Sequence, residues 1–252
     1  MSQILKGKVI QLGVQYAFRI TPKPSLTNGE KTALESALKT LSPKFGDLFQ
    51  RIDSDVPKAA GGGALLFQAF RQYPVESQFA SGLSFVLATD SISVLLITFI
   101  GGKNTQFVES SDRLLVPQWN EKMQGLMYKV LDVIGAKGNR AGKIYELVLG
   151  PFLPEEKSIV LESLFGRIDK EIGSIQLQTA RFKDIGGKLF NIQSVIQFEQ
   201  NSLNEPFRLV CKVDVNNRVM EEVLDPQDAK RVWDTADNVI REHLSEILPV
   251  EI

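Results

Sequence analysis

The chain has 252 residues, of which 43% are hydrophobic and 23% charged, and its formal net charge is −1. This composition is typical of a globular protein with a packed core, and neither half carries the excess of positive charge that marks a nucleic-acid-binding surface. One cysteine excludes an intramolecular disulfide, and neither a signal-peptide core nor the run of about 20 apolar residues that a membrane-spanning helix needs is present. We therefore expect a cytoplasmic protein.

The first third of the chain predicts a strand followed by a helix. Val9 to Ile20 is rich in β-branched and aromatic residues, and the prolines that follow cannot extend a strand ladder. Thr27 and Asn28 can cap a helix whose apolar residues recur at helical spacing from Ala33 to Leu41. From residue 44 to 78 the pattern is less regular, and Ala59–Ala64 predicts a flexible turn.

The middle of the chain predicts a hairpin and a long helix. The apolar segments Leu83–Ala88 and Ile92–Thr98 are separated by a short polar connection, which is typical of a hairpin. Pro117 suits the first turn of a helix that continues to Ile134. The glycine-rich segment from residue 135 to 143 has no apolar period and predicts a linker.

After this linker the order of elements repeats. A strand, a helix opening at Pro154, a hairpin, a half-buried strand and a final helix after Asp225-Pro226 are predicted in turn. The strand segments are Ile144–Leu149, Ile175–Phe182, Lys188–Glu199 and Phe207–Val215.

The repeated order defines the expected fold. We predict an α+β protein of mainly antiparallel sheets with flanking helices, built from two similar β-α-β-β-α halves at residues 1–136 and 137–252 that pack against each other. The similarity of Glu30–Leu38 to Glu156–Leu164 agrees with a duplication, but amphipathic helices often share such residues. A single irregular α+β domain is the alternative. If the halves are similar, the cleft between them is the expected ligand site.

Few residues suggest catalytic chemistry. His243 is the only histidine and is expected to be a packing or surface residue, and Cys211 alternates with apolar residues and is expected to be buried. Asp53 and Asp55 flank Ser54 and could bind a divalent ion or act as an acid–base pair, although their spacing does not match a calcium loop.

Basic and aromatic residues near the predicted linker suggest binding. Arg140 and Lys143, with Lys137, form a small basic cluster that could bind an anion or could be solvated, and Tyr145 follows in the next strand. We take Arg140, Lys143 and Tyr145 as candidate ligand-binding residues. Trp233 lies at a core position of its predicted helix and is expected to be buried.

Three segments carry a resemblance to a known family: Pro117–Glu121, Asn139–Val148 and Arg231–Asp237. From Asp112 on, a strand pair, a tryptophan-headed helix, a strand and a long amphipathic helix resemble a sporadically distributed family of uncharacterised prokaryotic proteins of similar length. The paired arginines of that family's central strand are absent here. Because the family has no assigned activity, the resemblance implies no catalytic residues, only an accessory role in conflict between host and mobile element.

These observations favour a non-enzymatic binding protein that recognises a protein or a small molecule, without a cofactor or a membrane, and that could form a homodimer. A metal-dependent hydrolase using Asp53 and Asp55 is the first alternative. A nucleic-acid-binding accessory protein, supported by the cations near residue 140, is the second and less favoured alternative.

Overall fold

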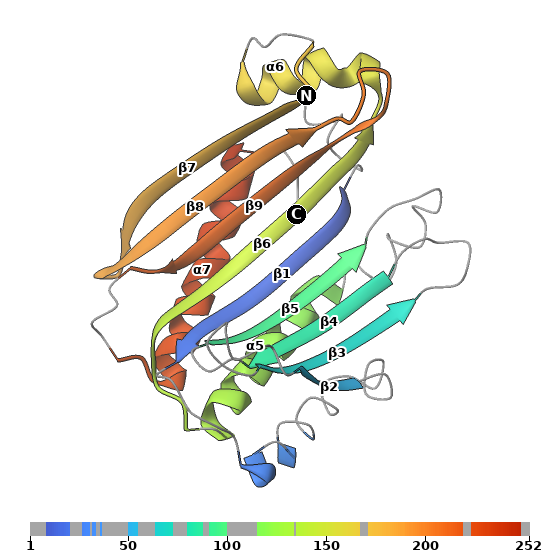
Figure 1. The fold of residues 1–252 in the computed structure, drawn as a ribbon. Helices are drawn as coiled ribbons and strands as arrows, with labels where there is room; N and C mark the ends of the chain where they lie inside the picture. Colours follow the sequence, from blue (N-terminus) through green and yellow to red (C-terminus); the bar gives the residue numbers. More distant parts are fainter. Residues whose placement is uncertain are drawn as a thin grey trace.

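The computed structural model is an α+β fold in which helices pack on an antiparallel sheet (Figure 1). It describes residues 9–20, 27–30, 32, 33, 36, 50–54, 64–72, 80–87, 91–99, 115–133, 135–166, 171–218 and 223–247. In this part of the chain no helix is long and apolar enough to cross a membrane.

One sheet of nine strands contains all the named strands, and every neighbouring pair is antiparallel. The strands are β1 (Val9–Ile20), β2 (Gln50–Ser54), β3 (Ala64–Gln72), β4 (Ala80–Leu87), β5 (Ser91–Phe99), β6 (Gly138–Phe152), β7 (Ser174–Ile185), β8 (Lys188–Glu199) and β9 (Phe207–Asn217). Their order across the sheet is β2-β3-β4-β5-β1-β6-β9-β8-β7. The predicted hairpins β4–β5 and β7–β8 are confirmed, and β1 and β8 have the predicted bounds.

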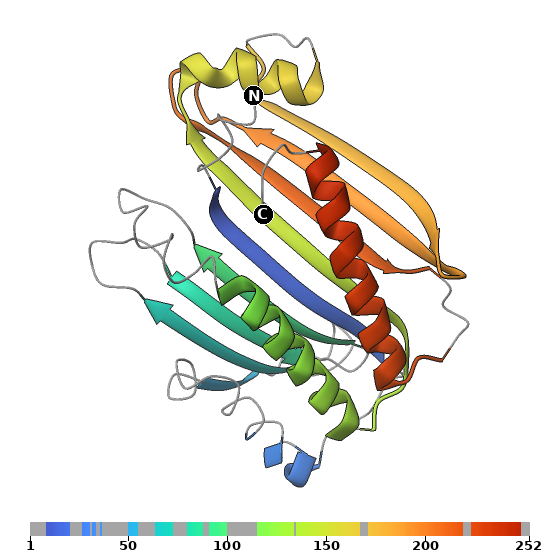
Figure 2. The same cartoon turned by 180° about the vertical axis from the view of Figure 1, so that it is seen from behind.

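Two long helices lie side by side on one face of this sheet (Figure 2). They are α5 (Leu115–Val133), which packs over β1 and β5, and α7 (Pro226–Ile247), which packs over β6 and β9. Asp225 caps α7 as expected, because its Oδ1 accepts a 2.8 Å hydrogen bond from the amide of Asp228. A short helix, α6 (Lys157–Phe165), follows the 3-10 turn η3 (Pro154–Glu156) at one end of the sheet.

The first predicted helix is described only in part. Residues 28–30, 32, 33 and 36 are helical, and the remainder lies outside the described residues. Thr27 begins it with a capping box: the Thr27 hydroxyl accepts from the amide of Glu30, and the Glu30 carboxylate accepts from the amide of Thr27.

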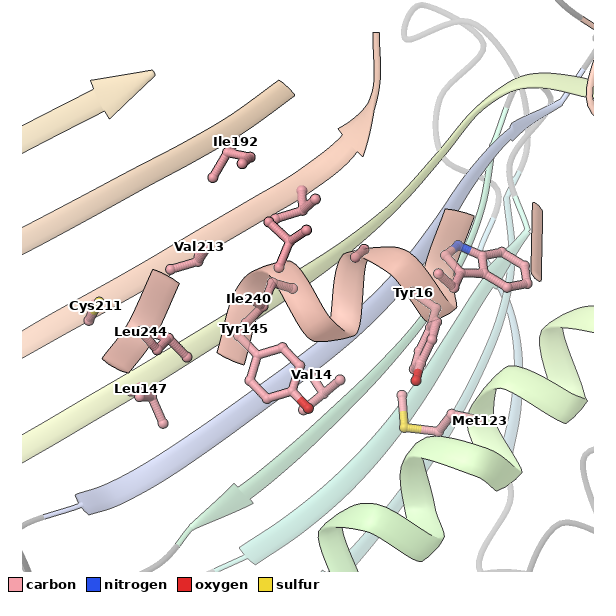
Figure 3. Packing of buried hydrophobic residues seen from close by; sticks show 14 of the residues in the cluster. Val14, Tyr16, Met123, Tyr145, Leu147, Ile192, Cys211, Val213, Ile240 and Leu244 are labelled. Atoms are coloured by element: carbon pink, nitrogen blue, oxygen red, sulfur yellow. The ribbon is translucent and has the colours of Figure 1, made fainter. Parts of the chain in front are cut away.

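The core lies between the sheet and the two long helices (Figure 3). Alternate residues of β1, β6, β8 and β9 point toward the helices and are almost completely buried, as the strand period of two requires. Cys211 is 1% exposed on this face and Trp233 of α7 is 0% exposed, so both burial predictions are confirmed. The Trp233 ring packs edge-on against Tyr16 and Phe18, with centroid distances of 5.8 and 6.4 Å.

Two sequence predictions are wrong. The irregular region from residue 44 to 78 contains the strands β2 and β3, and the turn predicted at Ala59–Ala64 lies outside the described residues except for Ala64, which begins β3. The predicted linker from residue 135 to 143 is largely the first part of β6, a central strand. Its glycines permit close packing: a Cβ on Gly142 would lie 2.9 Å from the Cβ of Asn216, and one on Gly138 would lie 2.1 Å from the carbonyl oxygen of Arg19.

Candidate functional site

A pocket of about 310 Å³ lies between α5 and α7, above the junction of β1 and β6. Both helices and both strands contribute side chains to its walls, and most of these side chains are polar or charged. The lining residues are Tyr16, Glu121, Gln124, Lys143, Trp233, Asp234, Asp237, Asn238 and Arg241.

The backbone brings these side chains together in a simple way. Tyr16 of β1 and Lys143 of β6 are direct cross-strand partners, so their side chains project from the same face of the sheet. On α7, four polar residues recur at positions i, i+3, i+4 and i+7 and so form one stripe along the helix. These residues are Asp234, Asp237, Asn238 and Arg241.

Lys143 is a buried cation on the strand that forms the floor of the pocket. Its side chain is only 1% exposed, and its Nζ donates a 2.5 Å hydrogen bond to Oδ1 of Asp237. The same Nζ lies 4.7 Å from the ring centroid of Tyr16 and 5.0 Å from that of Tyr145. Burial lowers the pKa of Lys143, and the Asp237 carboxylate opposes this shift by stabilising the ammonium form.

Asp237 joins the buried lysine to the surface of α7. Besides Lys143 it accepts a 3.4 Å hydrogen bond from the Tyr145 hydroxyl, and its Oδ2 lies 3.0 Å from Nη2 of Arg241. Its side chain is 22% exposed, compared with 61% for Arg241. Burial raises the pKa of the neighbouring Tyr16 well above its ordinary value, so that residue is a neutral phenol.

A second polar contact links the two helices at the rim. Gln124 of α5 donates from Nε2 to Oδ1 of Asp234 on α7 at 2.6 Å, and Lys230 forms an ion pair with the other carboxylate oxygen at 2.8 Å. Burial alone would raise the pKa of Asp234, but the hydrogen bonds from Gln124 and Lys230 outweigh it and hold the pKa below its ordinary value. Asp234 is therefore ionised at neutral pH.

The apolar part of the pocket is held rigidly. The indole Nε1 of Trp233 donates to the carbonyl oxygen of Ala17 at 3.2 Å, which fixes the ring across β1. Its edge-on contact with Tyr16 closes this side of the pocket. The arrangement combines two aromatic rings, a buried ion pair below and a polar rim that can donate and accept hydrogen bonds.

The structure separates the three candidate ligand-binding residues. Lys143 and Tyr145 lie together around Asp237, whereas Arg140 is the cross-strand partner of Arg19 and belongs to the opposite face of the sheet. The prediction that Arg140 and Lys143 form one basic cluster at the surface is therefore wrong. Both residues belong to the strand β6, whose alternate side chains point to opposite faces of the sheet.

The candidate metal ligands do not form a described site. Asp53 belongs to β2, and Asp55 lies outside the described residues. Among the residues that the structure places, no group of three or more His, Cys, Asp or Glu side chains could hold a metal ion.

Sequence reasoning missed the pocket residues on the helices. The polar stripe of α7 was visible in the sequence as residues at i, i+3, i+4 and i+7 beside the apolar stripe. A surface helix normally presents such residues to solvent, and only the neighbouring α5 turns them into a pocket wall.

His243, the only histidine of the chain, is 4% exposed and is not part of the lining of this pocket. Its Nδ1 contacts the Arg181 guanidinium and lies 3.4 Å from Oε2 of Glu246. Because a guanidinium only donates hydrogen bonds, Nδ1 accepts and the proton of the neutral ring is on Nε2. Burial, together with the charge of Arg181, lowers the pKa of His243. This geometry agrees with the expected packing role.

A scan against models of known protein families found no match to the chain, and a search of curated proteins found no similar sequence. Membership of the prokaryotic family that the chain resembles therefore stays a prediction.

Proposed function

We propose that this protein is a non-enzymatic binding protein that holds a small polar molecule in the pocket between α5 and α7. The buried pair of Lys143 and Asp237 beneath the pocket carries the proposal. Taking a lysine and an aspartate out of water costs several kcal/mol per ion, and stability alone could be obtained with apolar residues of similar volume. A perturbed charged pair in a concave site is a mark of a functional position.

The size and charge of the pocket define the ligand class. A volume of about 310 Å³ is near the lower end of the range of about 300–1,000 Å³ for small-molecule sites, which favours a metabolite over a peptide. Asp234 and Asp237 are already bound to cations, whereas the exposed Glu121 has no ion pair among the described residues. We infer that the ligand carries a positively charged group for Glu121 and apolar surface for Tyr16 and Trp233.

Binding is favoured over catalysis because the groups nearest the floor are engaged with one another. Asp237 has three partners in Lys143, Tyr145 and Arg241, so it is held as a fixed acceptor instead of a base free to take a substrate proton. The lining contains three carboxylates and two cations, a balance that does not favour the phosphates of a nucleic acid.

The strand order supports an origin by duplication. Read outward from the junction of β1 and β6, the order is β1-β5-β4-β3-β2 on one side and β6-β9-β8-β7 on the other, so the first series has the additional edge strand β2. Each series begins with the first strand of its half, and a long helix closes each half. We propose that residues 1–136 and 137–252 are two similar halves and that the pocket lies at their junction. A cytoplasmic accessory role in host or mobile-element conflict remains a prediction from the family resemblance.

The test is a binding screen with a pocket-filling variant. Spermidine, choline and L-arginine would serve as cationic probes, and glucose and citrate as neutral and anionic ones, measured by thermal shift and then by calorimetry. Asn238→Phe places a ring at the exposed rim and should weaken binding at least tenfold, about 1.4 kcal/mol. Gln227→Phe makes the same change at an exposed position of α7 outside the pocket and should leave binding unaltered.

Charge preference is tested separately. Glu121→Gln should weaken binding of a cation but not of a neutral compound, because only the carboxylate is lost. If Asn238→Phe abolishes binding and Glu121→Gln leaves it unaltered, the pocket is the binding site but Glu121 does not bind a positively charged group of the ligand. A probe that binds Asn238→Phe and Gln227→Phe equally well would contradict the proposal that the binding site is this pocket.

A further inference from the structure

We infer that this chain forms a homodimer in which the β7 strands of two copies pair antiparallel and join the two sheets into one. This interface is independent of the pocket, because the pocket lies between α5 and α7. The strand β7 lies on the other side of α7 from α5 (Figure 2). The inference rests on the length, the exposure and the charge pattern of this edge strand.

The strand β7 is an unusually complete free edge. It has 12 residues, and all of them pair with β8 in one continuous register without a bulge. Every residue from Gln176 to Asp184 is exposed, and among the described strands only β8 pairs with this segment. The opposite edge of the sheet is β2, with only five residues, and short edge strands are a common way to avoid pairing.

The usual protections of an edge strand are weak here. The segment from Ser174 to Ile185 contains no proline and no glycine. Its two basic side chains are bound by α7: Arg181 pairs with Glu246 at 2.8 Å and Lys183 pairs with Glu242 at 2.9 Å. The two positive charges of the strand are therefore compensated within each copy, while Leu177 and Phe182 remain 43% and 54% exposed.

The distribution of charge along β7 favours antiparallel over parallel pairing with a second copy. All its charged residues lie in the second half of the strand, and the first half, Ser174–Thr179, has none. Antiparallel pairing about the strand centre places each charged half against the uncharged half of the other copy. With Thr179 on the two-fold axis, Arg181 lies opposite Leu177 and Lys183 opposite Ile175. Parallel pairing in register would instead stack like charges, which is destabilising.

The symmetry also closes the assembly. A two-fold axis perpendicular to the sheet uses the same strand in both copies, and the other edge of the described sheet is the five-residue strand β2, so a dimer and not a fibre results. It keeps the helices of both copies on one side of the joined sheet.

Disulfide trapping tests this arrangement directly. Residues that face themselves across the axis of an antiparallel pair have Cα atoms about 4.5–5.5 Å apart, within the range for a disulfide. Thr179→Cys or Ala180→Cys, depending on the register, should therefore give a disulfide-linked dimer in mild oxidant. The native Cys211 is buried and gives no background. Asn201→Cys, at an exposed loop position beyond the end of β8 and far along the sheet from residues 179 and 180, is the matched control and should remain monomeric on a non-reducing gel.

Sedimentation of uncrosslinked protein gives an independent readout. The unmodified chain should sediment as a dimer, and Ala180→Lys should shift it to monomer because the two lysines would lie opposite or diagonal to each other across the axis, whereas Asn201→Lys should not. The inference would be overturned if the chain is a monomer at all concentrations and neither Thr179→Cys nor Ala180→Cys forms a crosslink. The exposed edge of β7 would then be a surface for a different protein. A dimer that persists in Ala180→Lys would overturn it as well, because it would use another surface.

Discussion

Replacing Asp237 with asparagine should destabilise the protein strongly, because it leaves a buried lysine without its counter-charge. The Lys143 side chain is 1% exposed and cannot reach water without local opening, and the nearby Arg241 would then be an uncompensated like charge. Removing one member of a buried ion pair costs about 3–5 kcal/mol. The lower end applies here, since the asparagine amide oxygen can still accept the hydrogen bond. About 3 kcal/mol is a large part of the 5–15 kcal/mol that stabilises a typical domain.

The reciprocal change should cost less. In Lys143→Met the remaining Asp237 carboxylate is 22% exposed and keeps Arg241 and Tyr145 as partners, so we expect about 1–2 kcal/mol. The double variant should be less destabilised than the sum of the single changes by about 0.5–3 kcal/mol, the coupling typical of residues in contact. Urea unfolding followed by tryptophan fluorescence measures all three free energies.

The pH dependence of the stability of Asp237→Asn gives a second test of the pair of Lys143 and Asp237. Without the Asp237 carboxylate, the largest effect that opposes burial is lost, so the pKa of Lys143 in the folded state falls further. In the unfolded chain this pKa stays near 10.5. The unfolded chain then binds more protons, so stability rises with pH in this window. The cost of Asp237→Asn should therefore shrink between pH 7 and pH 9.5. A variant as stable as the original protein at pH 7, or a cost that does not change with pH, would refute the reasoning.

Three further predictions concern the core and the single histidine. Trp233→Ala should lower the free energy of unfolding by about 3–5 kcal/mol because it removes a fully buried ring, and an unchanged melting temperature would contradict this. Cys211 should resist a thiol reagent without denaturant, since it is 1% exposed and burial raises its pKa to about 12, and fast labelling would disprove its placement. His243→Gln should flatten the loss of stability as pH falls through about 6.5, because the folded pKa is lowered below that value and only the unfolded chain is readily protonated there. Equal slopes in both proteins would exclude that role.

The fold could be predicted well wherever periodicity was strong. The strand β8 and the helix α7 carry long regular patterns with clear ends, Gly187 before β8 and Asp225-Pro226 before α7, and these local signals agree with the final structure. The strands β2 and β3 have no comparable pattern, and pairing with neighbours in the sheet decides their conformation.

Gly138 and Gly142 contributed to the wrong prediction of a linker at residues 135–143. Glycine at a flexible linker and glycine at a crowded position look identical in a sequence, and only the partner strands show that space is the reason here. The same error placed Arg140 and Lys143 on one surface, although a strand sends alternate residues to opposite faces.

The pocket could be predicted only in outline. A ligand site between two similar halves stays a prediction from the repeated order of elements, and the contact of Lys143 with Asp237 joins residues 94 positions apart in the chain. This pair depends on how α7 packs over β6, which no local pattern specifies.

The indole resonance of Trp233 in a ¹H–¹⁵N spectrum tests the central proposal most directly. The chain has two tryptophans, so Trp233→Phe assigns the signal. A cationic probe that binds between α5 and α7 should shift this resonance in a saturable way, and the shift should vanish in Asn238→Phe but persist in Gln227→Phe. Saturable binding that leaves the Trp233 resonance unmoved, or moves it equally in both variants, would contradict a binding site in this pocket.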